Sequence, residues 1–251
     1  MIREHLFHKR AAADPLFRWR GGDISRIEAL SDGVFALTIT LIVVSSSVPA
    51  TAHELWLLVR DLPVFLVSFV MLLMAWHYHH MFFRRYGLED FLTMVLNGAF
   101  LFLVLFFAYP LKFLATFLWR LVLGDRAASD AMFAIPDGST WSNYELHVLM
   151  MVFYSAAIAG VFGVLALLVL RAWVKRDELE LDVLERFLTL QSIGHHLLTV
   201  GVALVSLAIL AFGAQPGYSG VVYFLLGPLH GILGFGGAAR VKRLRKQLVE
   251  A

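Results

Sequence analysis

The residues best suited to chemistry are two pairs of adjacent histidines, His79 with His80 in "AWHYHHMFFRR" and His195 with His196 in "LQSIGHHLLTV". Imidazoles ligate haem iron and zinc, and they transfer protons near neutral pH. Adjacent side chains on a helix point about 100° apart, so each pair could give only one ligand to a shared centre. Histidines inside a helical bundle more commonly donate hydrogen bonds between helices. A haem-binding membrane redox protein is therefore an alternative to a structural role for these imidazoles.

A second polar group stands at the start of the first apolar run, "RIEALSDGVFALTITLIVV", where Ser31 and Asp32 precede a long stretch of apolar side chains. A carboxylate buried alone in a bundle costs on the order of several kcal/mol, so Asp32 needs partners. We expect one polar network at the inner end of the bundle, made of Arg26, Ser31, Asp32, Trp76, His79, His80 and Asn97. Such a network could simply tie helices together, and in either case it fixes the rotation of the first helix.

Little else in the sequence suggests catalysis. The chain has no cysteine, which excludes disulfides, thiolate chemistry and cysteine-ligated metal clusters. Neither G-x-S-x-G nor H-E-x-x-H occurs, and carboxylates are nearly absent from the apolar runs. We therefore expect neither an enzyme nor a cofactor. A small-solute transporter would need a polar site near the membrane midplane, for which the candidates are Pro110 with Lys112 and Gly194 with His195.

These residues lie in a very apolar chain. Of its 251 residues, 59% are hydrophobic and 16% are charged, and the mean hydropathy is +0.74. A helix needs about 20 mainly apolar residues to cross a bilayer. Six stretches are long enough, at 28–48, 55–80, 91–119, 146–173, 188–212 and 219–238. They are apolar on all sides, unlike the strands of a membrane barrel. The sequence predicts an all-α, polytopic membrane bundle with six transmembrane helices.

Basic residues indicate the orientation, because lysine and arginine near the ends of spans stay in the cytoplasm. With the N-terminus inside, the inner side holds all lysines and arginines except Arg60, Lys112, Arg120 and Arg126. We therefore expect both termini to be cytoplasmic. The predicted segments are a cytoplasmic or interfacial stretch at 1–22, a six-helix domain at 23–240 and a basic tail at 241–251. A basic run beside a span usually contacts anionic lipid, so we expect no nucleic-acid partner.

Local patterns add two expectations. Ser142 and Glu145 form a capping-box pattern that predicts a helix start after the outer loop 120–145. In the first apolar run, Thr40 lies about 60° to one side of Leu37 and Asp32 about 140° away, toward neighbouring helices. One helical face collects Leu30, Val34, Leu37, Leu41 and Val44. An apolar stripe of this kind commonly marks ordinary helix packing, and a pore lining is the alternative.

The first apolar run resembles the first span of the TMEM175 family of potassium-permeable channels. The family signature is R-x-x-x-F-S-D, and the matching positions are Arg26, Ser31 and Asp32, with Leu30 in place of the phenylalanine. Two further matches are W-x-x-H-H, at Trp76, His79 and His80, and an asparagine followed by a mostly apolar run to a proline, from Asn97 to Pro110. These motifs lie within residues 26–110, and the six-span layout extends the resemblance over most of the chain.

The resemblance implies a homotetramer in which span one surrounds a central pore through the cell membrane of a prokaryote. The family's hydrophobic constriction falls on Leu37, and further layers toward the outside fall on Thr40 or Leu41 and on Val44. Potassium and other monovalent cations would be the permeant species, with membrane lipid as the surroundings and no bound cofactor.

Such a pore differs from a carbonyl-lined potassium filter, because the sequence contains no TVGYG. A ring of leucines offers no ligands, so it gates by dewetting. Potassium holds its water less tightly than sodium, and a narrow apolar ring should favour it modestly. Hydroxyls of Thr40 could supply oxygen contacts, and Ser45, Ser46 and Ser47 are expected to line the outer vestibule.

Overall fold

The structure, a computed structural model, describes residues 14, 16–44, 48–135 and 140–250, with side chains up to residue 246. Six helical segments of the described chain are long and apolar enough to cross a membrane, which confirms the predicted fold class. They are α2 (Arg26–Val44), α4 (Leu62–Tyr86), α5 (Phe91–Val122), α7 (Asn143–Val174), α8 (Val183–Ala211) and Pro216–Lys246. The last segment comprises α9 (Pro216–Val221), the 3-10 helix η1 (Val222–Leu225) and α10 (Leu226–Glu250). The predicted vestibule serines 45–47 and most of segment 1–22 lie outside the described residues.

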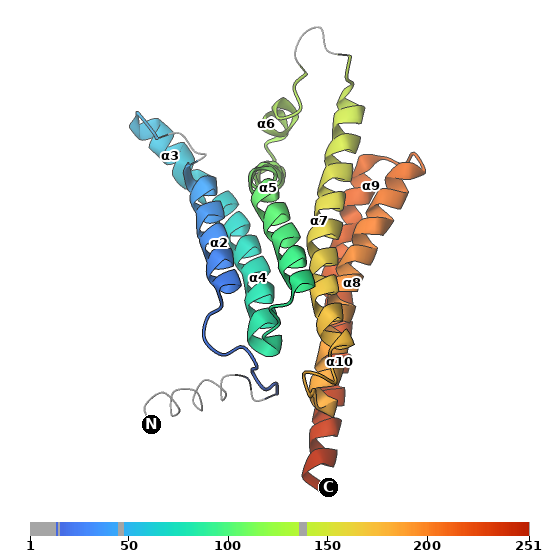
Figure 1. The fold of residues 1–251 in the computed structure, drawn as a ribbon. Coiled ribbons are helices and arrows are strands. Elements are labelled where there is room, and N and C mark those ends of the chain that lie inside the picture. The colour runs from blue at the N-terminus through green and yellow to red at the C-terminus, as the bar shows by residue number, and fades with distance from the viewer. Residues whose placement is uncertain (1–13, 15, 45–47, 136–139, 251) are drawn as a thin grey trace.

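The helices form two groups that α5 and α7 join (Figure 1). In the first group, α2 packs on α4 and α5. In the second, α7 runs along α8, and α10 also packs against α8. Large side chains such as Phe83, Phe100 and Leu168 fill the core between the groups. Within the described chain, α2 is therefore held by α4 and α5 and not by α7 or α8.

The second span begins later than the sequence predicts. A break at Asp61 divides the expected segment 55–80 into α3 (Ala52–Arg60) and α4. The hydroxyl of Thr51 caps α3 by accepting a hydrogen bond from the Glu54 amide at 3.2 Å. Pro63 stands in the first turn of α4, where its missing N–H costs nothing. The prediction failed because α3 is apolar enough to look continuous with the span that follows it.

The loop predicted to lie outside carries the short helix α6 (Arg126–Ala131) and then leads into α7. The capping box predicted for α7 is confirmed. The Ser142 hydroxyl accepts from the Glu145 amide at 3.2 Å, and the Glu145 carboxylate accepts from the Ser142 amide at 2.7 Å. Each side chain satisfies a backbone donor that the first turn of a helix leaves unpaired.

At the other end of the bundle, Asp90 joins the start of α5 to the end of α7. Its carboxylate accepts from the Thr93 amide at 2.9 Å and from the Arg171 guanidinium at 2.6 Å. Burial alone would raise the pKa of Asp90, but the hydrogen bonds from Thr93 and the ion pair with Arg171 outweigh it. They hold the pKa of this carboxyl well below its usual range.

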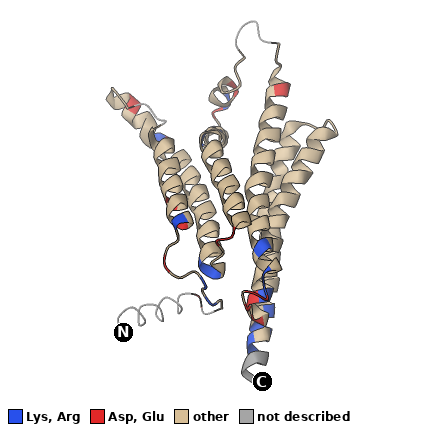
Figure 2. Cartoon of the chain, viewed as in Figure 1, with Lys and Arg blue, Asp and Glu red and all other residues tan. Residues whose placement is uncertain are grey.

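The segment predicted as a separate basic tail, 241–251, is helical as far as it is described, because α10 continues to Glu250. Figure 1 shows that α2 begins and α10 ends at the same end of the bundle. Lysine and arginine gather at this end, on α4, α7 and α10, and are sparse along the middle of the helices (Figure 2). This distribution matches the uneven placement of lysine and arginine between the two sides, from which the orientation is predicted.

Candidate functional site

The first membrane helix, α2, has one buried face. Its buried residues recur at spacings of three and four, which places them on one side of the helix against α4 and α5. They are Glu28, Ser31, Phe35, Thr38 and Ile42. Phe35 packs against the rings of His79 and Phe100, with ring centroids 6.1 Å apart in both cases. This contact fixes the rotation of α2.

The opposite face of α2 is uncovered in the single chain. Leu37 is 52% exposed and Val44 70% exposed, and Thr40 lies exposed between them. The Thr40 hydroxyl donates to the Ala36 carbonyl at 2.8 Å, which leaves its oxygen lone pairs free to accept. Leu41 is half-buried at the edge of this face. The candidate pore residues Leu37, Thr40 and Val44 therefore share one surface, and Leu41 borders it.

Three of the predicted network residues form a buried hydrogen-bond chain across α2, α4 and α5. The Asn97 amide nitrogen donates to the Ser31 hydroxyl at 3.1 Å, and the Asn97 oxygen lies 2.6 Å from His79 Nε2. Ser31 in turn donates to the Ile27 carbonyl at 2.8 Å. All three side chains are buried, so their mutual hydrogen bonds replace those that water would make. The chain ties three helices together at one level.

Asp32 belongs to a separate pair on the rim of α2. Trp76 Nε1 donates to the Asp32 carboxylate at 2.7 Å, and the Trp76 ring stacks on His80 with centroids 5.1 Å apart. Asp32 itself is exposed. Arg26 is exposed and makes no hydrogen bond or ion pair with the described part of the chain. The predicted single network is therefore two clusters, and Arg26 lies outside both.

A buried ion pair that the sequence analysis missed also anchors α2. Arg84, near the end of α4, holds Glu28 in the first turn of α2 by a fork of three hydrogen bonds at 3.0, 2.6 and 2.7 Å. The two side chains are only 8% and 9% exposed. A glutamate within the signature motif and an arginine near the end of span two were the available signals, but nothing in their spacing indicates that they meet.

His195, His196 and His230 lie on α8 and α10, away from α2. His195 of α8 and His230 of α10 face one another with Nδ1 atoms 2.7 Å apart, and His230 Nε2 lies 3.0 Å from the Thr199 hydroxyl. His196 is buried against the ring of Tyr78, with centroids 5.3 Å apart. The described residues contain no group of three or more side chains placed to hold a metal ion. These imidazoles contact neighbouring helices.

The transporter candidates also lie in helix contacts. Pro110 is inside α5, and its carbonyl accepts a hydrogen bond from the Tyr154 hydroxyl of α7 at 2.5 Å. Lys112 Nζ donates to the Ile42 carbonyl of α2 at 3.2 Å. Gly194 faces Leu233, since a Cβ placed on it would lie 3.6 Å from that side chain. Lys112 therefore adds a further link between α5 and α2.

Comparisons with known proteins place the chain in a family. Residues 26–108 match the family model described as the endosomal/lysosomal potassium channel TMEM175. A protein of Marivirga tractuosa named potassium channel is 36% identical over 238 residues, which cover 91% of this chain and 94% of that one. A potassium channel of Chamaesiphon minutus is 36% identical over 107 residues, 38% of this chain and 51% of that one.

A solved structure supports the same assignment. The crystal structure of a variant of the potassium channel MtTMEM175, in complex with a nanobody fusion protein, has a TM-score of 0.76 to this chain. The two are 35% identical in sequence, and the match covers 90% of this chain and 98% of the other. The similarity thus extends well beyond the signature motifs, over about nine-tenths of the chain. This chain belongs to the TMEM175 family.

Proposed function

We propose that this chain is a potassium channel, with α2 lining the conduction path of a homotetramer and Leu37 forming its constriction. The observation that carries the proposal is the uncovered face of α2. Leu37, Thr40 and Val44 are exposed together, while buried contacts anchor the opposite face. Relatives that match nearly the whole chain are named potassium channels and not enzymes, which supports permeation as the activity.

The geometry of α2 supports an oligomer. One α2 helix cannot surround a path for an ion, so the uncovered face needs copies of itself to close a pore. Repetition of α2 around a symmetry axis would bring equivalent Leu37 side chains together in a ring. The family resemblance supports four copies. In this arrangement α4 and α5 stand behind α2 and hold its rotation through the Ser31 and Glu28 contacts.

The constriction works by dewetting and needs no bound cofactor. A ring of leucine side chains offers an ion no oxygen ligand, so a narrow ring excludes water and blocks conduction. A wider ring admits a partly hydrated ion. Thr40, one turn further along α2, presents an oxygen that can contact the ion as it passes, because its proton is engaged by the Ala36 carbonyl. Potassium gives up water more readily than sodium, so this pair of layers favours potassium.

We further propose that the protein lies in the cell membrane of a prokaryote with both termini in the cytoplasm. Basic side chains at the end where α2 begins and α10 ends (Figure 2) support this orientation. Anionic lipid headgroups would contact the basic end of α10.

The experiment compares potassium flux into liposomes for the wild type and Leu37→Ala, with sodium gradients run alongside. The matched control is Leu204→Ala on α8, because Leu204 is 55% exposed and Leu37 52%. We expect the wild type to pass potassium faster than sodium, Leu37→Ala to raise flux or reduce the preference, and Leu204→Ala to behave as wild type.

Three results would contradict the proposal or a part of it. If intact wild-type oligomers pass no potassium, the chain is not a channel under these conditions. If flux saturates at the slow turnover of a carrier, with no unitary current steps, the transporter alternative replaces it. If Leu37→Ala and Leu204→Ala change flux and selectivity equally, Leu37 does not form the constriction, although the proposed channel activity still stands.

A further inference from the structure

The segment before α2, residues 16–22, forms a strap across the cytoplasmic end of the bundle. Phe17 is buried within it, and its ring meets Tyr86 of α4 edge-on with centroids 5.4 Å apart. The Arg85 guanidinium lies 4.9 Å from the centroid of the same ring. The strap is therefore packed against the end of α4.

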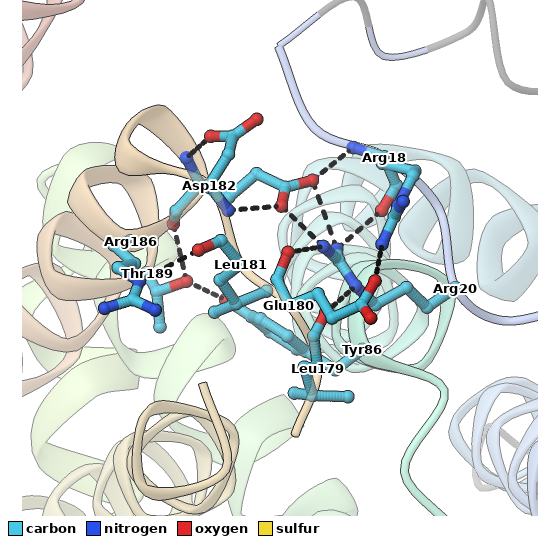
Figure 3. A network of polar contacts seen from close by, with 10 residues as sticks. Arg18, Arg20, Tyr86, Leu179, Glu180, Leu181, Asp182, Arg186 and Thr189 are labelled. Atoms are coloured by element: carbon cyan, nitrogen blue, oxygen red, sulfur yellow. Dashed lines mark hydrogen bonds and ion pairs between the residues drawn. The ribbon is translucent and has the colours of Figure 1, made fainter. Parts of the chain in front are cut away.

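A buried ion pair fastens the strap to α8 (Figure 3). Arg20 Nη2 lies 2.5 Å from Glu185 Oε2, and Arg20 Nη1 donates to Glu185 Oε1 at 3.1 Å. The two side chains are 11% and 3% exposed. Arg20 also donates to the Leu179 carbonyl at 2.6 Å and to the Glu180 carbonyl at 3.1 Å, so its guanidinium is held on several sides.

Glu185 is also held in place by contacts that do not involve the Arg20 side chain. It is the third residue of α8 and completes the capping box with Asp182, whose amide donates to its carboxylate at 3.1 Å. The same carboxylate accepts from the Arg18 amide at 2.7 Å. One turn along α8, Thr189 lies 2.9 Å from the Tyr86 hydroxyl of α4. The ion pair is therefore part of a rigid junction and not a contact between two flexible side chains.

The strap is also bonded to the residues that anchor α2. The amides of Arg20 and Gly21 both donate to the Arg84 carbonyl at 3.1 Å, and the Arg84 guanidinium donates to the Gly22 carbonyl at 3.0 Å. That guanidinium is the one that holds Glu28 of α2. Position 21 requires glycine, because a Cβ there would lie 2.6 Å from the Phe83 carbonyl oxygen and clash with it. Glu185, Arg20, Arg84 and Glu28 thus form one continuous set of contacts from α8 to α2.

We infer that the Arg20–Glu185 pair is a positioning device that sets the open probability of the pore by fixing the cytoplasmic end of α2. The inference rests on the proposed function, in which α2 lines the conduction path. Within the described chain α2 does not pack on α7 or α8, and the strap links α8 to the residues that anchor α2. Removing one partner leaves a buried charge uncompensated, and the strap must then move to hydrate it.

The test uses Arg20→Gln and Glu185→Gln, each alone and together. Arg18→Gln is the matched control, because Arg18 stands in the same strap and pairs with Glu180 at 3.5 Å, but these side chains are 61% and 80% exposed. We expect each single variant to change single-channel open probability at least tenfold. The double variant should change open probability less than either single one, because it leaves no unpaired buried charge. Arg18→Gln should stay within twofold of wild type.

Two readouts separate positioning from general damage. The potassium-to-sodium permeability ratio should be unchanged in all variants, because Leu37 and Thr40 lie roughly two and a half and three and a third turns beyond Glu28 along α2. Amide hydrogen exchange in residues 26–30 should become at least tenfold faster in the two single variants and remain unchanged in Arg18→Gln. Arg20→Lys keeps the charge but loses the forked pair of guanidinium donors. Its open probability and its amide exchange rate should lie between those of wild type and Arg20→Gln.

Open probability and exchange that stay at wild-type values in folded oligomers of both single variants would overturn the inference. A change in the permeability ratio without a change in open probability would overturn it as well. If the variants do not assemble, Arg20→Lys and the exchange measurement on it decide the question. Wild-type protein that passes no potassium refutes the proposed function instead, and hydrogen exchange then still tests whether the pair fixes the end of α2.

Discussion

Replacing Glu28 by alanine should destabilise the protein more than any exposed charge substitution. Glu28→Ala removes all three hydrogen bonds that its carboxylate accepts from Arg84 and leaves only the bond from that guanidinium to the Gly22 carbonyl. Because both side chains are over nine-tenths buried, the unpaired guanidinium keeps its desolvation cost without compensation. Breaking a buried pair in this way costs about 3–5 kcal/mol of the free energy of unfolding.

The assay is chemical unfolding of the purified protein in detergent, with the free energy of unfolding taken from the midpoint and slope. Glu178→Ala is the control, because Glu178 pairs with Lys175 at the surface and should cost less than about 1 kcal/mol. The double variant Glu28→Met with Arg84→Met should lose less stability than Glu28→Ala, since apolar side chains of similar volume replace buried charges without large cost.

The reasoning would be refuted by a loss below about 1 kcal/mol for Glu28→Ala, because a pair this buried cannot be worth as little as an exposed one. A double variant that loses the sum of two large single effects would also refute it. That outcome would mean that each residue stabilises the fold through contacts of its own and not through the pair.

Two further predictions concern selectivity and acid stability. Thr40→Val keeps the shape of the side chain and removes the oxygen, so the potassium-to-sodium permeability ratio from reversal potentials should fall severalfold. The free energy of unfolding should stay within about 0.5 kcal/mol of wild type because Thr40 is exposed. Equal ratios in the two proteins would contradict this. Asp90 has a lowered pKa, so its stabilising effect is complete above its ordinary value of 3.8 and is lost as the pH falls through the folded-state pKa. Asp90→Asn, which loses charge-assisted bonds from Arg171, should cost about 1.5–3 kcal/mol at pH 7 and lose less stability than wild type on acidification below about pH 4. Parallel pH curves for the two proteins would refute this.

Hydropathy and spacing predict a large part of this fold. The six spans follow from the length of the apolar runs, because every backbone group in a bilayer must be paired within a helix. The start of α7 at Ser142 follows from a local pattern whose two partners are three residues apart. The break between α3 and α4 is not visible in the hydropathy, because both sides of Asp61 are apolar and only Pro63 marks the new start.

The candidate site is predicted less completely, and the difference is physical. Helical periodicity assigns Leu37 and Val44 to one face, since this needs only the geometry of a single helix. It does not name partners on other helices. Glu28 meets Arg84 across 56 residues of chain, and Arg20 meets Glu185 across 165. Both pairs depend on how helices pack, which no local spacing encodes.

The central claim is that the uncovered face of α2 borders the path of the ion. The chain has no native cysteine, so an introduced one is the only thiol that a reagent can modify. The most direct measurement is the block of potassium current by a water-soluble, charged thiol reagent on Thr40→Cys and Val44→Cys, with Leu204→Cys on α8 as the control. The account predicts block of the α2 variants and none of the control. Block of Leu204→Cys with unaffected α2 variants would contradict it.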